Sequence, residues 1–112
     1  MRLLFSLFLS FFTVYRLTIG SSFAEEIDLD AGAQVFSDNC AACHIGGKNS
    51  VNPQKTLELE VLSKFSKDSV DAIKLQVENG AGAMPAFGDR LSDEDISNVA
   101  NFVLNSAKNN SW

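Results

Sequence analysis

The chain has 112 residues, with 14 acidic residues against nine basic ones and a formal net charge of −5. This length suits one domain whose own hydrophobic core is small. The acidic balance disfavours nucleic acid and anionic membrane surfaces as partners, and it favours a basic docking surface on a protein partner.

Residues 1–24 have the composition of a secretory signal peptide. Arg2 is followed by a run of Leu, Phe and Ser without an acidic residue, and this run is too short to span a membrane. Small residues precede a predicted cleavage site after Ala24, and the alternative is a retained anchor. Cleavage leaves a single domain over residues 25–112. Because Arg2 and Arg16 are removed, the nine basic residues fall to seven and the formal charge becomes 7 − 14 = −7.

The most specific pattern is C-A-A-C-H at positions 40–44, directly after a helix predicted over residues 29–39. C-x-x-C-H is the attachment site of a c-type haem. The spacing lets one turn of backbone present the sulfurs of Cys40 and Cys43 to one porphyrin edge, and it places His44 as an axial iron ligand. Zinc or thiol redox chemistry is a weaker alternative, because the chain has no other cysteine or histidine and a helix precedes the motif.

Beyond the motif, regular structure is predicted to stop at the glycine pair 46–47, and residues 48–55 form an irregular loop. Residues 56–62 mix apolar and charged side chains in a pattern that predicts a helical turn or two. Residues 70–79 repeat apolar side chains at three- and four-residue steps, which predicts a helix. Gly80 ends this helix as a residue suited to a left-handed C-cap.

Residues 80–88 are predicted to form a glycine-rich loop, and no segment of useful length alternates as a β-strand does. The last helix begins at Ser92, where Ser92 and Asp95 form a capping box. Its apolar side chains share one face, which consists of Ile96, Val99, Ala100, Val103 and Leu104. The sequence therefore predicts an all-α domain.

Met84 is the only methionine that remains after the predicted cleavage, and it lies in the 80–88 loop with Pro85 behind it. The proline disfavours a helical conformation at Met84 and holds the loop extended, so the thioether can be aimed at the iron as a second axial ligand. A thioether ligand favours Fe(II) and raises the reduction potential. The alternatives are a methionine that fills the core beside Phe87, or Lys55 as the sixth ligand.

Together these motifs resemble cytochrome c6 of algae and cyanobacteria, over essentially the whole mature chain. The resemblance implies an all-α, class I cytochrome c fold of about four helices around one covalently attached haem c. It also implies an electron carrier, not an enzyme, in the thylakoid lumen of a plastid or cyanobacterium. The matching runs are residues 35–44, 46–47, 76–80, 83–88 and 91–96.

The resemblance further implies a route in which one electron passes from cytochrome f of the cytochrome b6f complex to photosystem I. By position, Gln76 would lie near the haem and its methionine ligand, and Arg90 would contribute to docking on photosystem I. Residues 48–53 depart from the usual family loop. We expect a monomer without stable membrane insertion after signal cleavage.

The same residues also suit other functions. A bacterial-type class I cytochrome c would have the same iron chemistry but would donate to a terminal oxidase or another periplasmic enzyme. An open sixth coordination site would instead suit a peroxidase or a ligand sensor. Gln76 has an ordinary alternative as a helix-surface amide, and Arg90 as a solvated loop charge.

Overall fold

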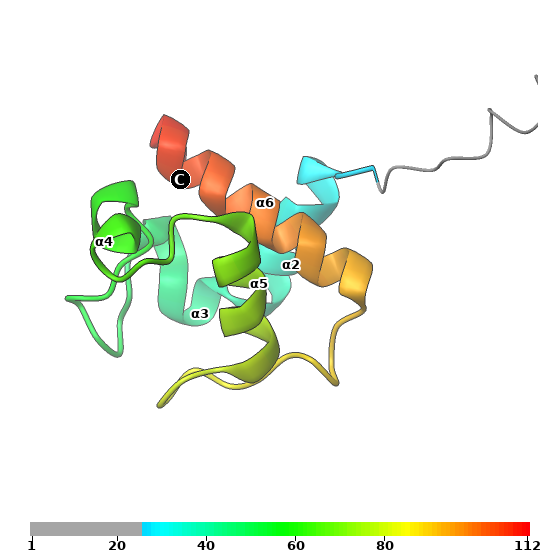
Figure 1. The fold of residues 1–112 in the computed structure, drawn as a ribbon, viewed down its shortest axis with the longest axis horizontal. Coiled ribbons are helices and arrows are strands. Elements are labelled where there is room, and N and C mark those ends of the chain that lie inside the picture. Colours follow the sequence, from blue (N-terminus) through cyan, green and yellow to red (C-terminus); the bar gives the residue numbers. More distant parts are fainter. Residues whose placement is uncertain (1–25) are drawn as a thin grey trace, which may run out of the picture.

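The computed structural model describes residues 26–112, so the predicted signal peptide and its cleavage site lie outside the described residues. The described chain is helical, and its only β-type pairing is an isolated bridge between Ala81 and Met84. This architecture confirms the all-α prediction. The elements are α2 (Leu29–Asn39), α3 (Ala41–His44), the 3-10 helix η1 (Ile45–Gly47), α4 (Leu59–Lys64), α5 (Val70–Asn79) and α6 (Asp93–Asn109) (Figure 1).

Helix α6 is the centre of the packing, because it contacts α2, α5 and α4 (Figure 1). The apolar face predicted for this helix is buried in full, with Ile96 and Ala100 completely inaccessible to solvent. Its first turn is capped by Ser92, whose Oγ accepts a hydrogen bond from the backbone N of Asp95 at 3.1 Å. These residues confirm the predicted start of the helix and its inward face.

Helix α2 crosses α6 at a glycine. A Cβ atom placed on Gly32 would lie 2.2 Å from the backbone O of Asn98, so only glycine allows this close approach. Asp28 caps α2, because its Oδ1 accepts from the backbone N of Ala31 at 3.0 Å. The backbone N of Asp28 also donates to Oδ1 of the buried Asn98 at 3.0 Å, which ties the start of α2 to α6.

Helix α5 has the predicted bounds, but its end differs from the prediction. Gly80 has a positive φ of 68° with an extended ψ of −178°, so it is not in the left-handed helical region. A Cβ on Gly80 would lie 2.5 Å from the backbone O of Met84, and this close approach explains the glycine. The chain thus turns sharply into the loop that carries Met84.

Helix α4 begins at Leu59, three residues after the predicted start at Thr56. The two residues after Thr56 make other contacts: the backbone N of Leu57 donates to the O of Gly47, and that of Glu58 to Oγ1 of Thr56. The backbone N atoms of Leu57 and Glu58 are therefore hydrogen-bonded outside the helix, which begins at Leu59. No helix within residues 26–112 has the length and apolar character needed to cross a membrane.

Candidate functional site

The two cysteines of the C-x-x-C-H motif lie on one tight turn. Cys40 ends α2 and starts α3, with its backbone N bonded to the O of Phe36 at 2.8 Å. The backbone N atoms of Cys43 and His44 both donate to the O of Cys40, at 3.2 and 2.9 Å. Cys40 is half-buried, Cys43 is exposed, and both thiols are free. The two cysteines and the histidine therefore lie on one helical turn.

His44 is held by its Nδ1 atom, which lies 2.9 Å from the backbone O of Lys48. A carbonyl oxygen only accepts hydrogen bonds, so Nδ1 is the donor and Nε2 is the nitrogen that remains to bind a metal. Within residues 26–112, no hydrogen-bond partner occupies Nε2. An imidazole that is oriented through one nitrogen and leaves the other exposed has the arrangement of a metal ligand.

The acceptor for His44 belongs to a turn with several anchors. Gly46 and Gly47 have positive φ values of 63° and 75°, which reverses the chain directly after α3. The O of Gly47 accepts from the backbone N of Leu57 at 2.8 Å. Lys48 Nζ forms an ion pair with Glu58 across the base of the loop. The turn that carries the Lys48 carbonyl is thus bonded to the segment before α4.

The irregular loop predicted over residues 48–55 is present and is organised by Asn49. Its Oδ1 accepts from the backbone N of Val51 at 3.1 Å and of Asn52 at 2.8 Å, and its Nδ2 donates to the O of Lys55 at 2.9 Å. The loop is therefore irregular in dihedral angles but internally bonded. Lys55 Nζ lies 5.3 Å from the ring centroid of Phe65, a cation–π distance.

Met84 lies in a tight turn at the end of the molecule where α5 ends. The backbone N and O of Met84 pair with the O and N of Ala81 at 3.0 and 3.1 Å. The loop returns along α5, because the backbone N of Phe87 donates to the O of Val77 at 2.8 Å. The Met84 side chain is half-buried and packs against the core. The thioether is therefore held in place by backbone bonds on both sides of it.

Gln76 and Met84 are brought together across the turn. The Nε2 of Gln76, on α5, lies 3.8 Å from the sulfur of Met84, a weak N–H···S hydrogen bond. The sequence separates the two residues by eight positions, and the sharp turn at Gly80 makes the contact. Gln76 therefore contacts Met84 directly, and its position relative to a haem stays a prediction.

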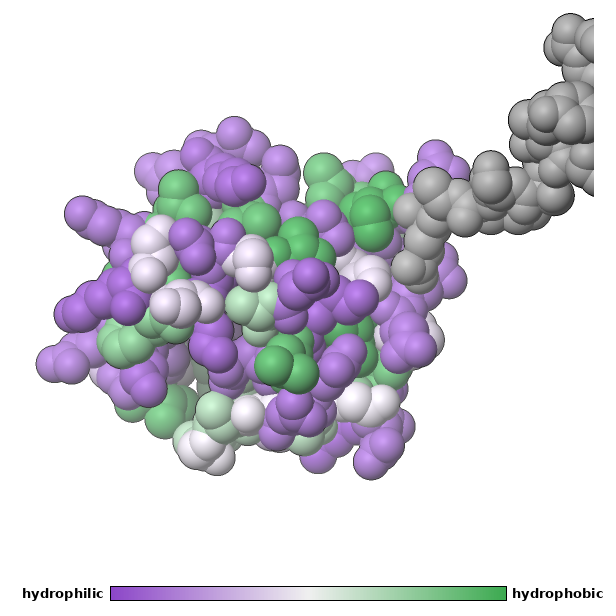
Figure 2. Space-filling view, viewed as in Figure 1, coloured by the Kyte–Doolittle hydropathy of each residue, from purple (hydrophilic) through white to green (hydrophobic). Residues whose placement is uncertain are grey.

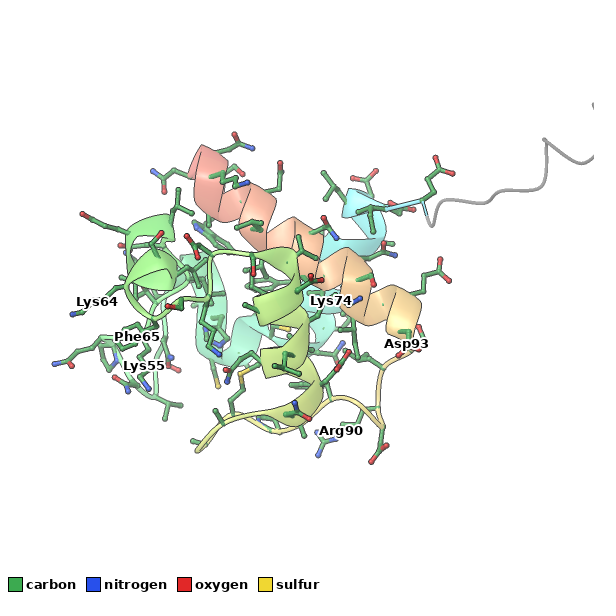
Figure 3. All side chains as sticks on the ribbon, viewed as in Figure 1. Lys55, Lys64, Phe65, Lys74, Arg90 and Asp93 are labelled. Atoms are coloured by element: carbon green, nitrogen blue, oxygen red, sulfur yellow. The ribbon has the colours of Figure 1, made fainter. Side chains whose placement is uncertain are left out.

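Arg90 is exposed on the loop between α5 and α6, apart from Lys55 and Lys64, which flank Phe65 (Figure 3). Its guanidinium carbon lies 5.6 Å from the ring centroid of Phe87, a cation–π distance. Phe87 belongs to the Met84 loop and is buried, so Arg90 is held near that loop by its own stacking contact.

The side chains present fit a covalently held haem. A nitrogen ligand, a thioether and two thiols suit iron-porphyrin chemistry, whereas residues 26–112 contain no cluster of three His, Cys, Asp or Glu side chains able to hold a bare metal ion. Burial raises the pKa of the Cys40 thiol from 9.0 to about 11. Reactive redox thiols have lowered pKa values, so Cys40 does not have the character of a thiol oxidoreductase.

Two residues near the site were not singled out by the sequence. Trp112 follows α6 and lies against Gly47, and Lys48 supplies the carbonyl that bonds His44. Helical periodicity could not indicate Trp112, because it lies beyond the helix. Lys48 acts through its backbone carbonyl, a group that every residue has, so its residue type gives no indication of this role in the sequence.

Comparison with known proteins agrees with this site. A family model described as cytochrome c oxidase, cbb3-type, subunit III matches residues 27–103. Cytochrome c6 of Gracilaria tenuistipitata var. liui is 51% identical over 97% of this chain and 98% of its own length. Chloroplastic cytochrome c6 of Chlamydomonas reinhardtii is 51% identical over 86% of this chain and 66% of its own.

Among solved structures, cytochrome c6 of the diatom Phaeodactylum tricornutum is 52% identical and superposes with a TM-score of 0.72. The match covers 73% of this chain and 97% of the diatom chain. Sequence and fold thus agree over most of the described domain. The chain belongs to the cytochrome c6 family of class I c-type cytochromes, electron carriers with one covalently bound haem c.

Proposed function

We propose that this protein carries single electrons from cytochrome f of the cytochrome b6f complex to photosystem I. The observation that carries the proposal is the 51% identity to an algal cytochrome c6 over nearly the full length of both chains. The family membership supports the route, and the acidic chain supports electrostatic steering to basic surfaces. The location we propose is the thylakoid lumen, in line with the chloroplastic name of the Chlamydomonas relative.

The roles proposed for the site residues follow from their positions. Cys40 and Cys43 would hold the haem through thioether bonds, and His44 and Met84 would ligate its iron. The haem supplies a one-electron Fe(III)/Fe(II) couple when bound. His44 offers Nε2 because Nδ1 is bonded to Lys48, and the thioether of Met84 is presented by its bonded turn.

Ligation by Met84 is tested with carbon monoxide on the reduced protein at neutral pH. Because a thioether would close the sixth position, we expect the parent to bind carbon monoxide slowly or not at all, and Met84→Ala to bind it promptly. Prompt binding by the parent would contradict the ligand assignment and would favour a ligand sensor or a peroxidase.

Gln76 is proposed to raise the reduction potential. A hydrogen bond donated to the Met84 sulfur withdraws electron density from it, which stabilises Fe(II) relative to Fe(III). Gln76→Leu should therefore lower the potential measured by redox titration. The matched control is Gln34→Leu, since Gln34 is exposed on α2 and bonds only Asp38. Equal potentials for Gln76→Leu and the parent would contradict this role.

Arg90 is proposed to contribute to docking on photosystem I. On the face in Figure 2, apolar residues are interrupted by polar ones, which suits a small and wet contact with fast release. Arg90→Gln should slow oxidation by photosystem I without a change in reduction potential. Lys108→Gln is the control, because Lys108 is an exposed cation in the last turn of α6.

The whole function is tested by flash-induced oxidation of the reduced holoprotein by photosystem I particles across a salt series. We expect fast transfer that slows with salt, because exposed charges are screened. Transfer no faster than that of an unrelated small cytochrome would overturn the proposal. It would favour the second candidate, donation to a terminal oxidase, to which the description of the matching family model points.

The mature chain is proposed to begin at Glu25, after removal of residues 1–24, and to be monomeric. The mass of the protein purified from its native source should equal the mass of residues 25–112 plus that of one haem. Size-exclusion chromatography with light scattering checks the monomer. A mass that includes the leader would instead indicate a retained anchor.

A further inference from the structure

We propose that Trp112 is a positioning residue for the iron ligand His44, acting through Gly47 and the carbonyl of Lys48. The inference rests on the proposed function, because it assumes that His44 ligates the iron. It concerns a residue that neither the haem motif nor the methionine loop contains.

Trp112 reaches this position because the chain reverses after α6. Asn110 adopts the left-handed conformation, with φ and ψ both 49°, and the backbone N of Ser111 donates to the O of Ser106 at 3.0 Å. The indole then lies 5.7 Å from the ring of Phe36 on α2 and 6.4 Å from that of Phe102 on α6. It is thus packed between the two crossing helices and the turn after α3.

The indole lies directly on Gly47. A Cβ atom placed on Gly47 would be 2.5 Å from Cε2, 2.6 Å from Nε1 and 2.7 Å from Cδ2 of Trp112. Gly47 is buried with a φ of 75°, and the ring fills the space that a side chain at this position would occupy. The indole therefore limits where the peptide between Gly47 and Lys48 can lie.

That peptide leads directly to the acceptor of His44. The unit between Gly47 and Lys48 is planar, so a shift of Gly47 also shifts the Cα of Lys48, to which the carbonyl of the next peptide unit is attached. The Lys48 carbonyl accepts from Nδ1 of His44 at 2.9 Å. This bond orients the imidazole and strengthens it as a donor to iron, which favours Fe(III). Loss of the indole should therefore weaken the bond and raise the reduction potential.

The turn is also held by the backbone bond from Leu57 to the O of Gly47, and its other side-chain anchor is more exposed than the indole. The ion pair of Lys48 and Glu58 has side chains that are 66% and 43% exposed, and pairs of this kind contribute little. The Nε1 of Trp112 is buried without a hydrogen-bond partner among the described residues, so the indole acts by ring packing. A phenylalanine at this position should keep part of that packing and rescue the effect.

The test compares holoproteins with Trp112→Ala, Trp112→Phe and Phe102→Leu. Phe102 belongs to the same aromatic group, but its substitution leaves the indole on Gly47 in place, so it is the matched control for stability. The readouts are the reduction potential, the hyperfine-shifted NMR signals of the His44 ring in the ferric protein, and thermal unfolding.

We expect Trp112→Ala to raise the reduction potential and to move the His44 signals. In both readouts Trp112→Phe should lie nearer the parent. Phe102→Leu should lower thermal stability without a change in the potential or in the His44 signals. Trp112→Ala that loses stability but leaves the potential and the His44 signals unchanged would overturn the inference. Should that variant fail to fold, Gly47→Ala presses a methyl group against the indole, and unchanged His44 signals there would overturn it equally. A parent protein without His44 ligation in its spectrum would overturn the proposed function itself.

Discussion

The crossing of α2 and α6 offers a test of the packing that supports the haem motif. Gly32→Ala would place a methyl group against the backbone O and C of Asn98, at 2.2 and 2.7 Å, and against Cβ of Phe102 at 2.9 Å. The first distance falls short of an ordinary contact of 3.4 Å by 1.2 Å (3.4 − 2.2). Two of the three atoms are backbone, so the helices must move apart for the methyl group to fit.

The size of the effect follows from two opposing terms. Overpacking of a core costs about 1–3 kcal/mol, and a clash with backbone lies at the upper end of that range. Alanine is the better helix former by about 1 kcal/mol, which offsets part of this cost. The net loss in the free energy of unfolding is therefore about 2 kcal/mol. For a domain of this size it corresponds to a fall in Tm of roughly 8–16 °C.

Thermal unfolding of the holoprotein, followed by far-ultraviolet circular dichroism, measures this fall. Ser37→Ala is the control, because Ser37 is exposed on the same helix and gains only helix propensity. Its Tm should rise slightly or stay constant. A Gly32→Ala protein with the Tm of the Ser37→Ala protein would refute the reasoning, since the helices would then tolerate the methyl group without separation.

Three other substitutions test single contacts. Ser92→Ala removes the cap of α6 and should lower the free energy of unfolding by about 1 kcal/mol in denaturant titrations, whereas no loss would show that water replaces the cap. Glu58→Gln breaks the exposed ion pair with Lys48 and should cost less than about 1 kcal/mol, a difference that shrinks as salt is added. Gly80→Ala would press on the O of Met84 and should lower the reduction potential as the thioether moves from Gln76; an unchanged potential would contradict this.

Much of the fold was predictable because its signals are local. The bounds of α2 and α5 follow from capping residues and from apolar spacing within each segment. The C-x-x-C-H motif is likewise local, since one turn of backbone holds Cys40 and His44 together. The buried face of α6 follows from helical periodicity, with Val99 and Val103 facing inward as predicted.

The features that were missed depend on contacts between distant segments. The start of α4 is set by the bond from Leu57 to Gly47, ten residues earlier in the chain. The need for glycine at position 32 is set by the backbone of Asn98, which no pattern within α2 reveals. The extended ψ of Gly80 reflects the close return of the Met84 loop. Propensity rules describe a segment in isolation, so they cannot include these neighbours.

The two proposed iron ligands are held by different parts of the fold. His44 depends on the turn at Gly47, which Trp112 joins to α2 and α6. Met84 depends on α5, through the backbone bond of its loop to Val77. Because α6 contacts both α2 and α5, it is the element through which a disturbance at one ligand reaches the other. A substitution that forces α2 and α6 apart should therefore affect the His44 side first, and one that forces α5 and α6 apart should affect the Met84 side first.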